Sequence, residues 1–282
     1  MYDFNDGVAF FDSGLGGLTV LSECKKRITD APFLYFGDNG RAPYGNLPEE
    51  TIRKHVFDVF GLFKRMRVRA AVVACNTVTA LCVDELRTVC DFPIVGTEPA
   101  VFSAAVQGGE IFVLTTRATY QSERFRRLCQ SAEVRYPNAR IRLYPCDGLA
   151  GEIERRLFEE TFDCTSLLPA GKPDAVVLGY THYVYMKAQI SAYYGCPVYD
   201  GNKGVAKRLA NVLGKNFVQN REARPLAGYK EKDGQGGAYA ETEDTCATGA
   251  AKLCLSSGGA PIFFLGSHQN VNKRVFEQMF AK

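Results

Sequence analysis

The sequence lacks several features that would place it in other protein classes. No apolar run approaches the roughly 20 residues that span a bilayer, which excludes a transmembrane protein. Only three histidines and no Cys-x-x-Cys pair accompany its ten cysteines, so a structural zinc site is not expected. The N-terminus has no basic segment of a signal peptide, so we expect a cytoplasmic protein with reduced cysteines. Neither sign of charge dominates, with 34 Lys and Arg against 31 Asp and Glu, which disfavours a nucleic-acid partner.

The chain of 282 residues instead alternates short apolar runs with helical stretches. One series of apolar runs covers residues 7–11, 33–36, 70–74 and 93–95, and a second covers residues 111–114, 141–144, 174–178 and 197–199. This alternation is typical of an α/β fold with largely parallel sheets. We therefore predict two similar α/β lobes. Lobe 1 would comprise residues 1–98 and 208–282, with an exposed connection at 220–244 and a last strand and helix after residue 261, and lobe 2 would comprise residues 99–207.

Two short polar segments occupy matching places in the two series. Cys75-Asn76-Thr77 and Tyr180-Thr181-His182 each follow the third apolar run of their series. In open α/β sheets, ligands bind beyond the carboxyl ends of the strands, so facing lobes would hold a small ligand between these segments. Cys75 also precedes a predicted helix, whose N-terminal charge should lower the pKa of the thiol below about 8.5.

A glycine-rich loop, Asp12-Ser13-Gly14-Leu15-Gly16-Gly17, follows the first apolar run. It fits neither the P-loop pattern nor Gly-x-Gly-x-x-Gly, which disfavours nucleotide binding. Its backbone N–H groups at a helix start suit a carboxylate, and its glycines also suit a tight turn. Both interpretations remain open at the level of the sequence.

Seven segments resemble one family in order. They are FFDSGLGGLTVL (10–21), YFGDNGRAPYG (35–45), VVACNTVTA (72–80), VGTEPA (95–100), VLTTRATYQS (113–122), PCDGLAGEIE (145–154) and VVLGYTHY (176–183). Together they resemble the cofactor-independent glutamate racemases of the aspartate/glutamate racemase superfamily. The resemblance implies an active site between two lobes, no pyridoxal phosphate or metal, a homodimer, and D-glutamate made for peptidoglycan synthesis.

The resemblance also implies roles for individual residues. The implied catalytic residues are Cys75, Tyr180, His182, Asp12 and Glu152, of which His182 and Glu152 would assist on the second face of the substrate. The implied substrate-binding residues are Asp12, Ser13, Pro43, Tyr44, Gly45, Asn76, Thr77, Thr116, Thr119, Thr181 and His182.

Two residues depart from the family pattern. Tyr180 stands where the family has its second catalytic cysteine, and Val184 is a smaller departure, because proline is usual there. A racemase removes a proton from one face of a carbon and returns one to the other face, so a single residue does not easily serve both faces. Three hypotheses follow. The protein is a racemase with a Cys75/Tyr180 pair, or an enzyme of the same fold with one catalytic cysteine that exchanges a proton on one face or decarboxylates, or a silent paralogue that binds a ligand.

Overall fold

The computed structural model describes residues 4, 6–157, 159, 161–217, 254–255, 262–266 and 273–274. The connection predicted at 220–244 lies outside these residues, as does most of the predicted C-terminal helix.

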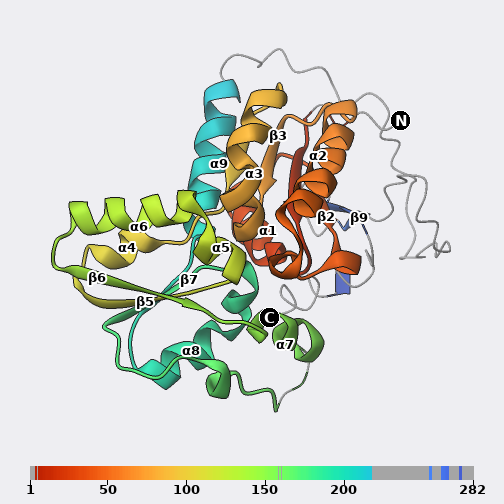
Figure 1. The fold of residues 1–282 in the computed structure, drawn as a ribbon. Coiled ribbons are helices and arrows are strands. Elements are labelled where there is room, and N and C mark those ends of the chain that lie inside the picture. The colour runs from red at the N-terminus through yellow and green to blue at the C-terminus, as the bar shows by residue number, and fades with distance from the viewer. Residues whose placement is uncertain are drawn as a thin grey trace.

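The described chain forms two lobes, each built around its own sheet (Figure 1). Lobe 1 has the strand order β4-β3-β1-β2-β10-β9 and lobe 2 the order β6-β5-β7-β8. Neighbouring strands are parallel except for β9 and β10. The first four strands of each lobe have the same spatial order, since β4-β3-β1-β2 in lobe 1 corresponds to β8-β7-β5-β6 in lobe 2. The predicted α/β fold with two similar, largely parallel lobes is therefore confirmed.

The strands are β1 (Val8–Asp12), β2 (Phe33–Gly37), β3 (Ala70–Val73), β4 (Ile94–Gly96), β5 (Gly109–Thr115), β6 (Ala139–Pro145), β7 (Ala175–Leu178), β8 (Val198–Tyr199), β9 (Cys254–Leu255) and β10 (Ile262–Leu265). The α-helices are α1 (Gly17–Lys25), α2 (Glu49–Arg65), α3 (Asn76–Val89), α4 (Val101–Ala105), α5 (Arg117–Gln121), α6 (Glu123–Arg135), α7 (Leu149–Arg156), α8 (Lys187–Tyr194) and α9 (Asn202–Phe217). Short 3₁₀ helices are η1 (Asn39–Arg41), η2 (Tyr44–Asn46), η3 (Thr165–Leu167) and η4 (Thr181–Met186).

Helices cover both faces of each sheet, which explains why the strands are almost continuously apolar. Successive side chains of a strand point to opposite faces. Phe10 accordingly packs with α1 and α9 on one face of lobe 1, and Phe11 packs with α2 and α3 on the other. In lobe 2, Phe112 faces α7 and α8, and Val113 faces α4 and α6.

Helix α9 belongs with the core of lobe 1. Val205, Ala206, Leu209 and Leu213 all pack in the hydrophobic cluster that contains α1 and strand β1. The boundary predicted at residues 207 and 208 falls within this helix. We propose residues 99–201 as lobe 2, because α9 packs against α1 along its length.

The strand order fixes where a ligand would bind. In both lobes the order reverses between the first and third strands, β1 and β3 in lobe 1 and β5 and β7 in lobe 2. Ligands of open α/β sheets bind at this switch point, beyond the carboxyl ends of the strands. Asp12 ends β1, and Cys75 and Tyr180 follow β3 and β7 closely. The segments predicted from the sequence therefore lie at the switch points of the two sheets.

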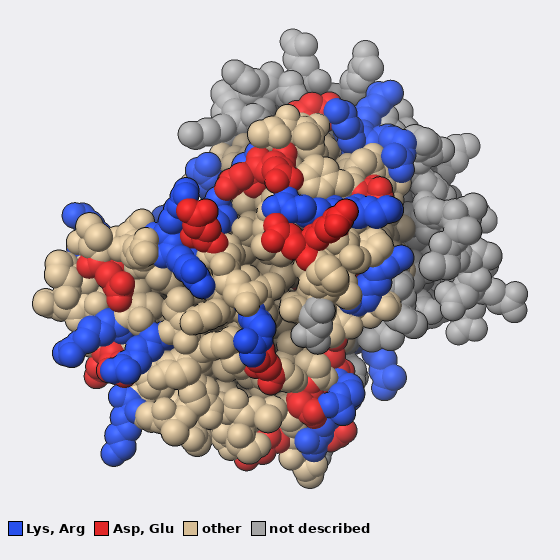
Figure 2. Space-filling view, in the orientation of Figure 1, with Lys and Arg blue, Asp and Glu red and all other residues tan. Residues whose placement is uncertain are grey.

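The surface carries both signs of charge. On the face in Figure 2, Lys and Arg side chains are interspersed with Asp and Glu side chains rather than gathered into one basic field. Within the described ranges, no helix has both the length and the apolar character needed to cross a membrane.

Candidate active site

The glycine-rich loop of lobe 1 holds the carboxylate of Asp12 in a fixed position. Asp12 Oδ2 accepts hydrogen bonds from the backbone N–H groups of Gly14 and Gly17, each at 3.0 Å. The hydroxyl of Tyr35 lies 3.4 Å from the same oxygen and donates to the carbonyl of Gly14 at 2.8 Å. Asp12 Oδ1 is buried and has no hydrogen-bond partner among the described residues. The loop therefore leaves one carboxylate oxygen available to a ligand.

Cys75 lies at the N-terminus of α3, as the sequence predicts. Its sulfur lies 3.5 Å from the hydroxyl oxygen of Ser13. This hydroxyl and the backbone N–H of Val78 both favour the thiolate. The thiol thus has two groups nearby that stabilise its basic form.

Burial nevertheless outweighs these donors. Removal from water and, after it, the charge of the neighbouring Asp12 carboxylate together raise the pKa of Cys75 to about 12. The expectation of a lowered pKa is wrong for this arrangement, because the closed lobes bury the thiol completely. A cationic group bound beside Asp12 would shift the balance back toward the thiolate.

Tyr180 lies on the lobe 2 side and is buried. Its ring stacks on the His182 imidazole, with centroids 4.6 Å apart and planes 10° apart. Burial, followed by the charges of Cys75, Asp12 and Glu154, raises the pKa of the phenol well above its ordinary value. Among the described residues the hydroxyl has no hydrogen bond of normal geometry, although Ser13 lies near enough to favour its ionised form.

The structure pairs His182 with Glu154. His182 Nε2 lies 2.6 Å from Glu154 Oε1. The carboxylate of Glu152 pairs instead with Arg155. Two residues apart on α7, the glutamates point to nearly opposite sides of the helix, so only one of them can face the site. The structure thus brings Glu154, which the sequence analysis did not name, to His182, and the assisting role of Glu152 stays a prediction.

The remaining predicted substrate-binding residues come from both lobes. Thr77 Oγ1 lies 3.2 Å from Thr116 Oγ1, which in turn donates to Thr119 Oγ1 at 3.1 Å. Gly45 lies so close to Thr116 that an added Cβ would approach the Cβ of Thr116 to 3.2 Å. The structure thus brings these threonines of the two lobes together.

Three other predicted residues already have clear structural contacts. Pro43 precedes the short helix η2, and the Tyr44 hydroxyl donates to Asp38 Oδ2 at 2.7 Å. The Asn76 side-chain amide donates to the carbonyl of Thr97 at 3.1 Å. Tyr44 and Asn76 therefore help to shape the site whatever ligand it takes.

Four buried polar atoms in and around the glycine-rich loop have no hydrogen-bond partner in the described part of the chain. They are Asp12 Oδ1, Tyr180 Oη, Thr181 Oγ1 and His182 Nδ1. Buried polar groups are nearly always paired, so such a cluster points to a small polar ligand or ordered water. Across the described residues, no group of three His, Cys, Asp or Glu side chains is arranged to hold a metal ion.

Gly16 lies where the two lobes meet most closely, and its replacement tests that contact. An alanine Cβ there would lie 2.3 Å from Thr181 Oγ1 and 2.7 Å from the backbone nitrogen of His182. We expect Gly16→Ala to lower the free energy of unfolding by about 1–3 kcal/mol, because the site is fully packed. Thermal unfolding measures this loss.

Gly204→Ala is the matched control, because nothing lies within 4 Å of its added Cβ in α9. We expect it to stabilise the protein by about 0.4–1 kcal/mol. Equal stability of Gly16→Ala and the unchanged protein would contradict the close packing of the lobes at this loop.

Comparison with known proteins gives a consistent picture. The chain matches the Asp/Glu/Hydantoin racemase family over residues 19–209. Among curated proteins, the glutamate racemase of Clostridium kluyveri is 35% identical over 233 residues, which cover 77% of this chain and 88% of that protein. The glutamate racemase of Clostridium acetobutylicum is 32% identical over 226 residues, which cover 77% of this chain and 87% of that protein.

Solved structures agree. The fold matches glutamate racemase from Campylobacter jejuni with a TM-score of 0.67, 23% identity and coverage of 96% and 97% of the two chains. Glutamate racemase from Escherichia coli, solved with L-glutamate and the activator UDP-MurNAc-ala, matches with a TM-score of 0.65, 29% identity and coverage of 74% and 82%. The chain therefore belongs to the Asp/Glu/Hydantoin racemase family of isomerases and is similar to the glutamate racemases within it.

Proposed function

We propose that this protein interconverts L- and D-glutamate without a cofactor, and that Cys75 and Tyr180 act on opposite faces of the substrate α-carbon. The observation that carries the proposal is the placement of these two side chains. They follow equivalent strands of two facing lobes, and both are buried beside Asp12. The glutamate racemases to which the chain is similar support glutamate as the substrate.

In the proposed reaction, the Cys75 thiolate takes the α-proton of one enantiomer, and the electron pair of the broken C–H bond remains on the planar carbanion. The Tyr180 hydroxyl gives its proton to the opposite face, which forms the other enantiomer and leaves a phenolate. The reverse reaction exchanges these roles. Return of a proton from the Cys75 thiol to the Tyr180 phenolate restores the starting form, and the Ser13 hydroxyl lies beside both groups.

The four unpartnered atoms suit an amino acid. Asp12 Oδ1 would accept a hydrogen bond from the substrate ammonium group. The ammonium charge beside Cys75 would favour the thiolate and offset part of the burial that raises its pKa. The Thr181 hydroxyl, which has no partner among the described residues, would donate to a substrate carboxylate.

The raised pKa of Tyr180 also supports a second candidate. A phenol with so high a pKa is a weak acid and is scarcely ionised, so it donates a proton poorly and is rarely available as a base. In that case Cys75 would work alone and exchange a proton on one face or support decarboxylation. This is the single-cysteine hypothesis, and it predicts exchange without inversion.

Proton NMR in deuterium oxide separates these functions when L- and D-glutamate are incubated separately and optical rotation is followed. We expect both enantiomers to lose the α-proton signal and to racemise. Exchange of one enantiomer without inversion supports the single-cysteine enzyme. The absence of exchange with both enantiomers contradicts a glutamate racemase and leaves a ligand-binding paralogue.

We further propose that the protein acts as a cytoplasmic homodimer and supplies D-glutamate for peptidoglycan. The resemblance to glutamate racemases supports both statements. Light scattering of the purified protein tests the dimer, and D-glutamate dependence of a strain lacking the gene tests the supply.

A further inference from the structure

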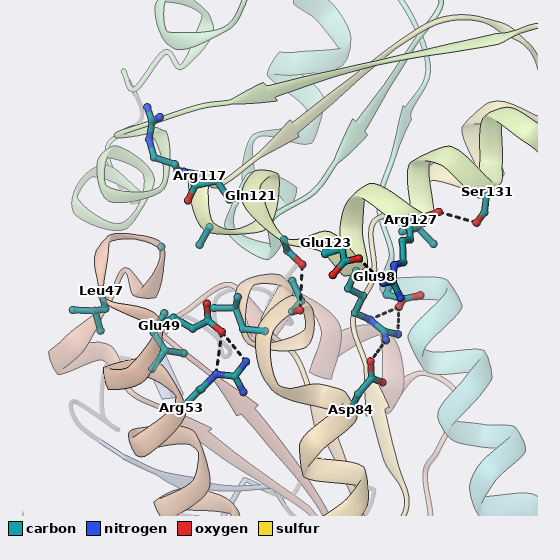
Figure 3. Close-up of a pocket in the computed structure, with 18 residues that line it drawn as sticks. Leu47, Glu49, Arg53, Asp84, Glu98, Arg117, Gln121, Glu123, Arg127 and Ser131 are labelled. Atoms are coloured by element: carbon teal, nitrogen blue, oxygen red, sulfur yellow. Dashed lines mark hydrogen bonds and ion pairs between the residues drawn. The ribbon is translucent and has the colours of Figure 1, made fainter.

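A cavity of about 880 Å³ lies between the lobes beside the candidate site. Figure 3 shows Glu49 and Arg53 of α2 and Asp84 of α3 on one side, with residues of α5 and α6 on the other. Gly45, one of the predicted substrate-binding residues, also lines it. The cavity therefore borders the seam along which α3 meets α5 and α6.

One face of α3 makes three polar contacts across this seam. Thr77, Ala80 and Asp84 are spaced by three and four residues, so they form a single stripe along the helix. Their partners in lobe 2 are, in order, Thr116 Oγ1 at 3.2 Å, Ser122 Oγ at 3.2 Å and Arg124 Nη1 at 2.5 Å. The same helix begins directly after Cys75, so opening of the seam would move lobe 2 away from the thiol.

Arg124 makes the outermost and most connected of these contacts. Its guanidinium on α6 reaches Asp84 of lobe 1, and it also binds Glu98 Oε1 through Nε at 3.1 Å and Nη2 at 2.5 Å. Glu98 lies in the segment that crosses from β4 to α4, between the lobes. Dashed lines at Asp84 and Glu98 mark these contacts in Figure 3. Arg124 thus joins both lobes and their connection.

We propose that Arg124 is a positioning residue that holds the lobes closed over Cys75 and so sets how often the thiol opens to substrate. The role in substrate access rests on the proposed function, whereas the contacts of Arg124 do not depend on whether the protein turns over glutamate. Cys75 is completely buried, so a substrate reaches it only when the lobes separate. Separation breaks the pair of Arg124 with Asp84. Since these side chains are one-third to two-thirds exposed, the contact is weak enough to be reversible.

The test measures the access of iodoacetamide to Cys75 in the full chain. Initial alkylation rates are read by peptide mass spectrometry, with Cys24 as internal reference, because it is also completely buried but lies in the core of lobe 1. We expect Arg124→Gln to speed alkylation of Cys75 by about two- to fivefold, the effect of losing an exposed ion-pair network. Cys24 should stay slow.

Arg127→Gln is the matched control. Arg127 lines the same cavity on the same helix, but its ion pair is with Glu123 within α6. Arg127→Gln should leave the alkylation rate of Cys75 unchanged. Asp84→Asn is a second variant, which removes a largely exposed carboxylate that pairs with Arg124 and, within α3, with Arg87. It should also speed alkylation of Cys75.

Equal Cys75 rates in Arg124→Gln and Arg127→Gln would overturn the proposal, as would a parallel rise at Cys24, which indicates general loosening of the fold. In steady-state kinetics with glutamate, we expect Arg124→Gln to leave kcat unchanged and not to raise KM, because the free protein opens to substrate more often. A protein without glutamate turnover contradicts the proposed function, whereas the alkylation rates still decide the role of Arg124.

Discussion

Cys75→Ala is expected to reduce exchange of the glutamate α-proton by about 10²- to 10⁴-fold, the contribution typical of a positioned acid or base. The variant removes the thiol that faces Ser13 and leaves the backbone of α3 in place. Cys75→Ser should lose activity as well, because a buried alcohol is a far weaker acid than a thiol. Proton NMR in deuterium oxide measures both variants with each enantiomer.

Cys24→Ala is the control for this experiment. Cys24 is as deeply buried as Cys75 and lies in the same lobe, but it packs in the core of α1. It should keep the exchange rate of the unchanged protein. Retained exchange in Cys75→Ala would remove Cys75 from the chemistry, whatever its position in the fold suggests.

Tyr180→Phe is expected to abolish inversion, by about 10²-fold or more, while the protein folds normally. The change removes only a hydroxyl and keeps the ring that stacks on His182. Because that hydroxyl is buried without a hydrogen bond, its removal should leave stability unchanged or raise it by about 1 kcal/mol. Cys75 should still exchange the proton of one enantiomer. NMR and optical rotation together separate exchange from inversion.

Tyr183→Phe is a matched comparison on η4, the 3₁₀ helix that begins directly after Tyr180. The Tyr183 hydroxyl donates to the carbonyl of Cys146 at 3.2 Å and lies 3.4 Å from that of Thr115. Its loss should destabilise the protein by about 1–2 kcal/mol and preserve inversion.

Tyr180→Cys completes the series, since it restores the thiol that the family resemblance implies. Normal inversion in Tyr180→Phe would show that the Tyr180 hydroxyl transfers no proton to or from the substrate. Faster inversion in both Tyr180 variants would identify the tyrosine as an obstruction of the site.

The fold could be predicted from the sequence because its signals are local. Runs such as residues 70–74 and 174–178 are short and apolar and are separated by helical stretches, a pattern that few other arrangements share. The same pattern placed Cys75 and Tyr180 at strand ends. The order of strands within each sheet depends on contacts between distant segments, so it became visible only in the structure.

The details of the site required the three-dimensional arrangement. Glu152 and Glu154 are the same residue type on one helix, so the sequence does not distinguish them. The orientation of α7 decides which of them meets His182, and α7 starts after Gly148, whose backbone is left-handed. The pKa of Cys75 depends on closure of the lobes, which no local pattern reports.

The contacts between the lobes could not be predicted from the sequence for a related reason. Arg124 pairs with Asp84, 40 positions away, and each residue by itself resembles an ordinary exposed charge. Such pairs are invisible without the fold that brings them together.

The equal strand order of the two sheets has a consequence for stereochemistry. A planar carbanion has mirror-related faces, and a scaffold made of two like halves offers each face an equivalent strand end. In this chain the halves agree in backbone but differ in chemistry, with sulfur on one side and a phenol on the other. The two directions of inversion would then proceed through chemically different acids. They should show different solvent isotope effects, because a thiol and a phenol differ in how strongly they hold a proton.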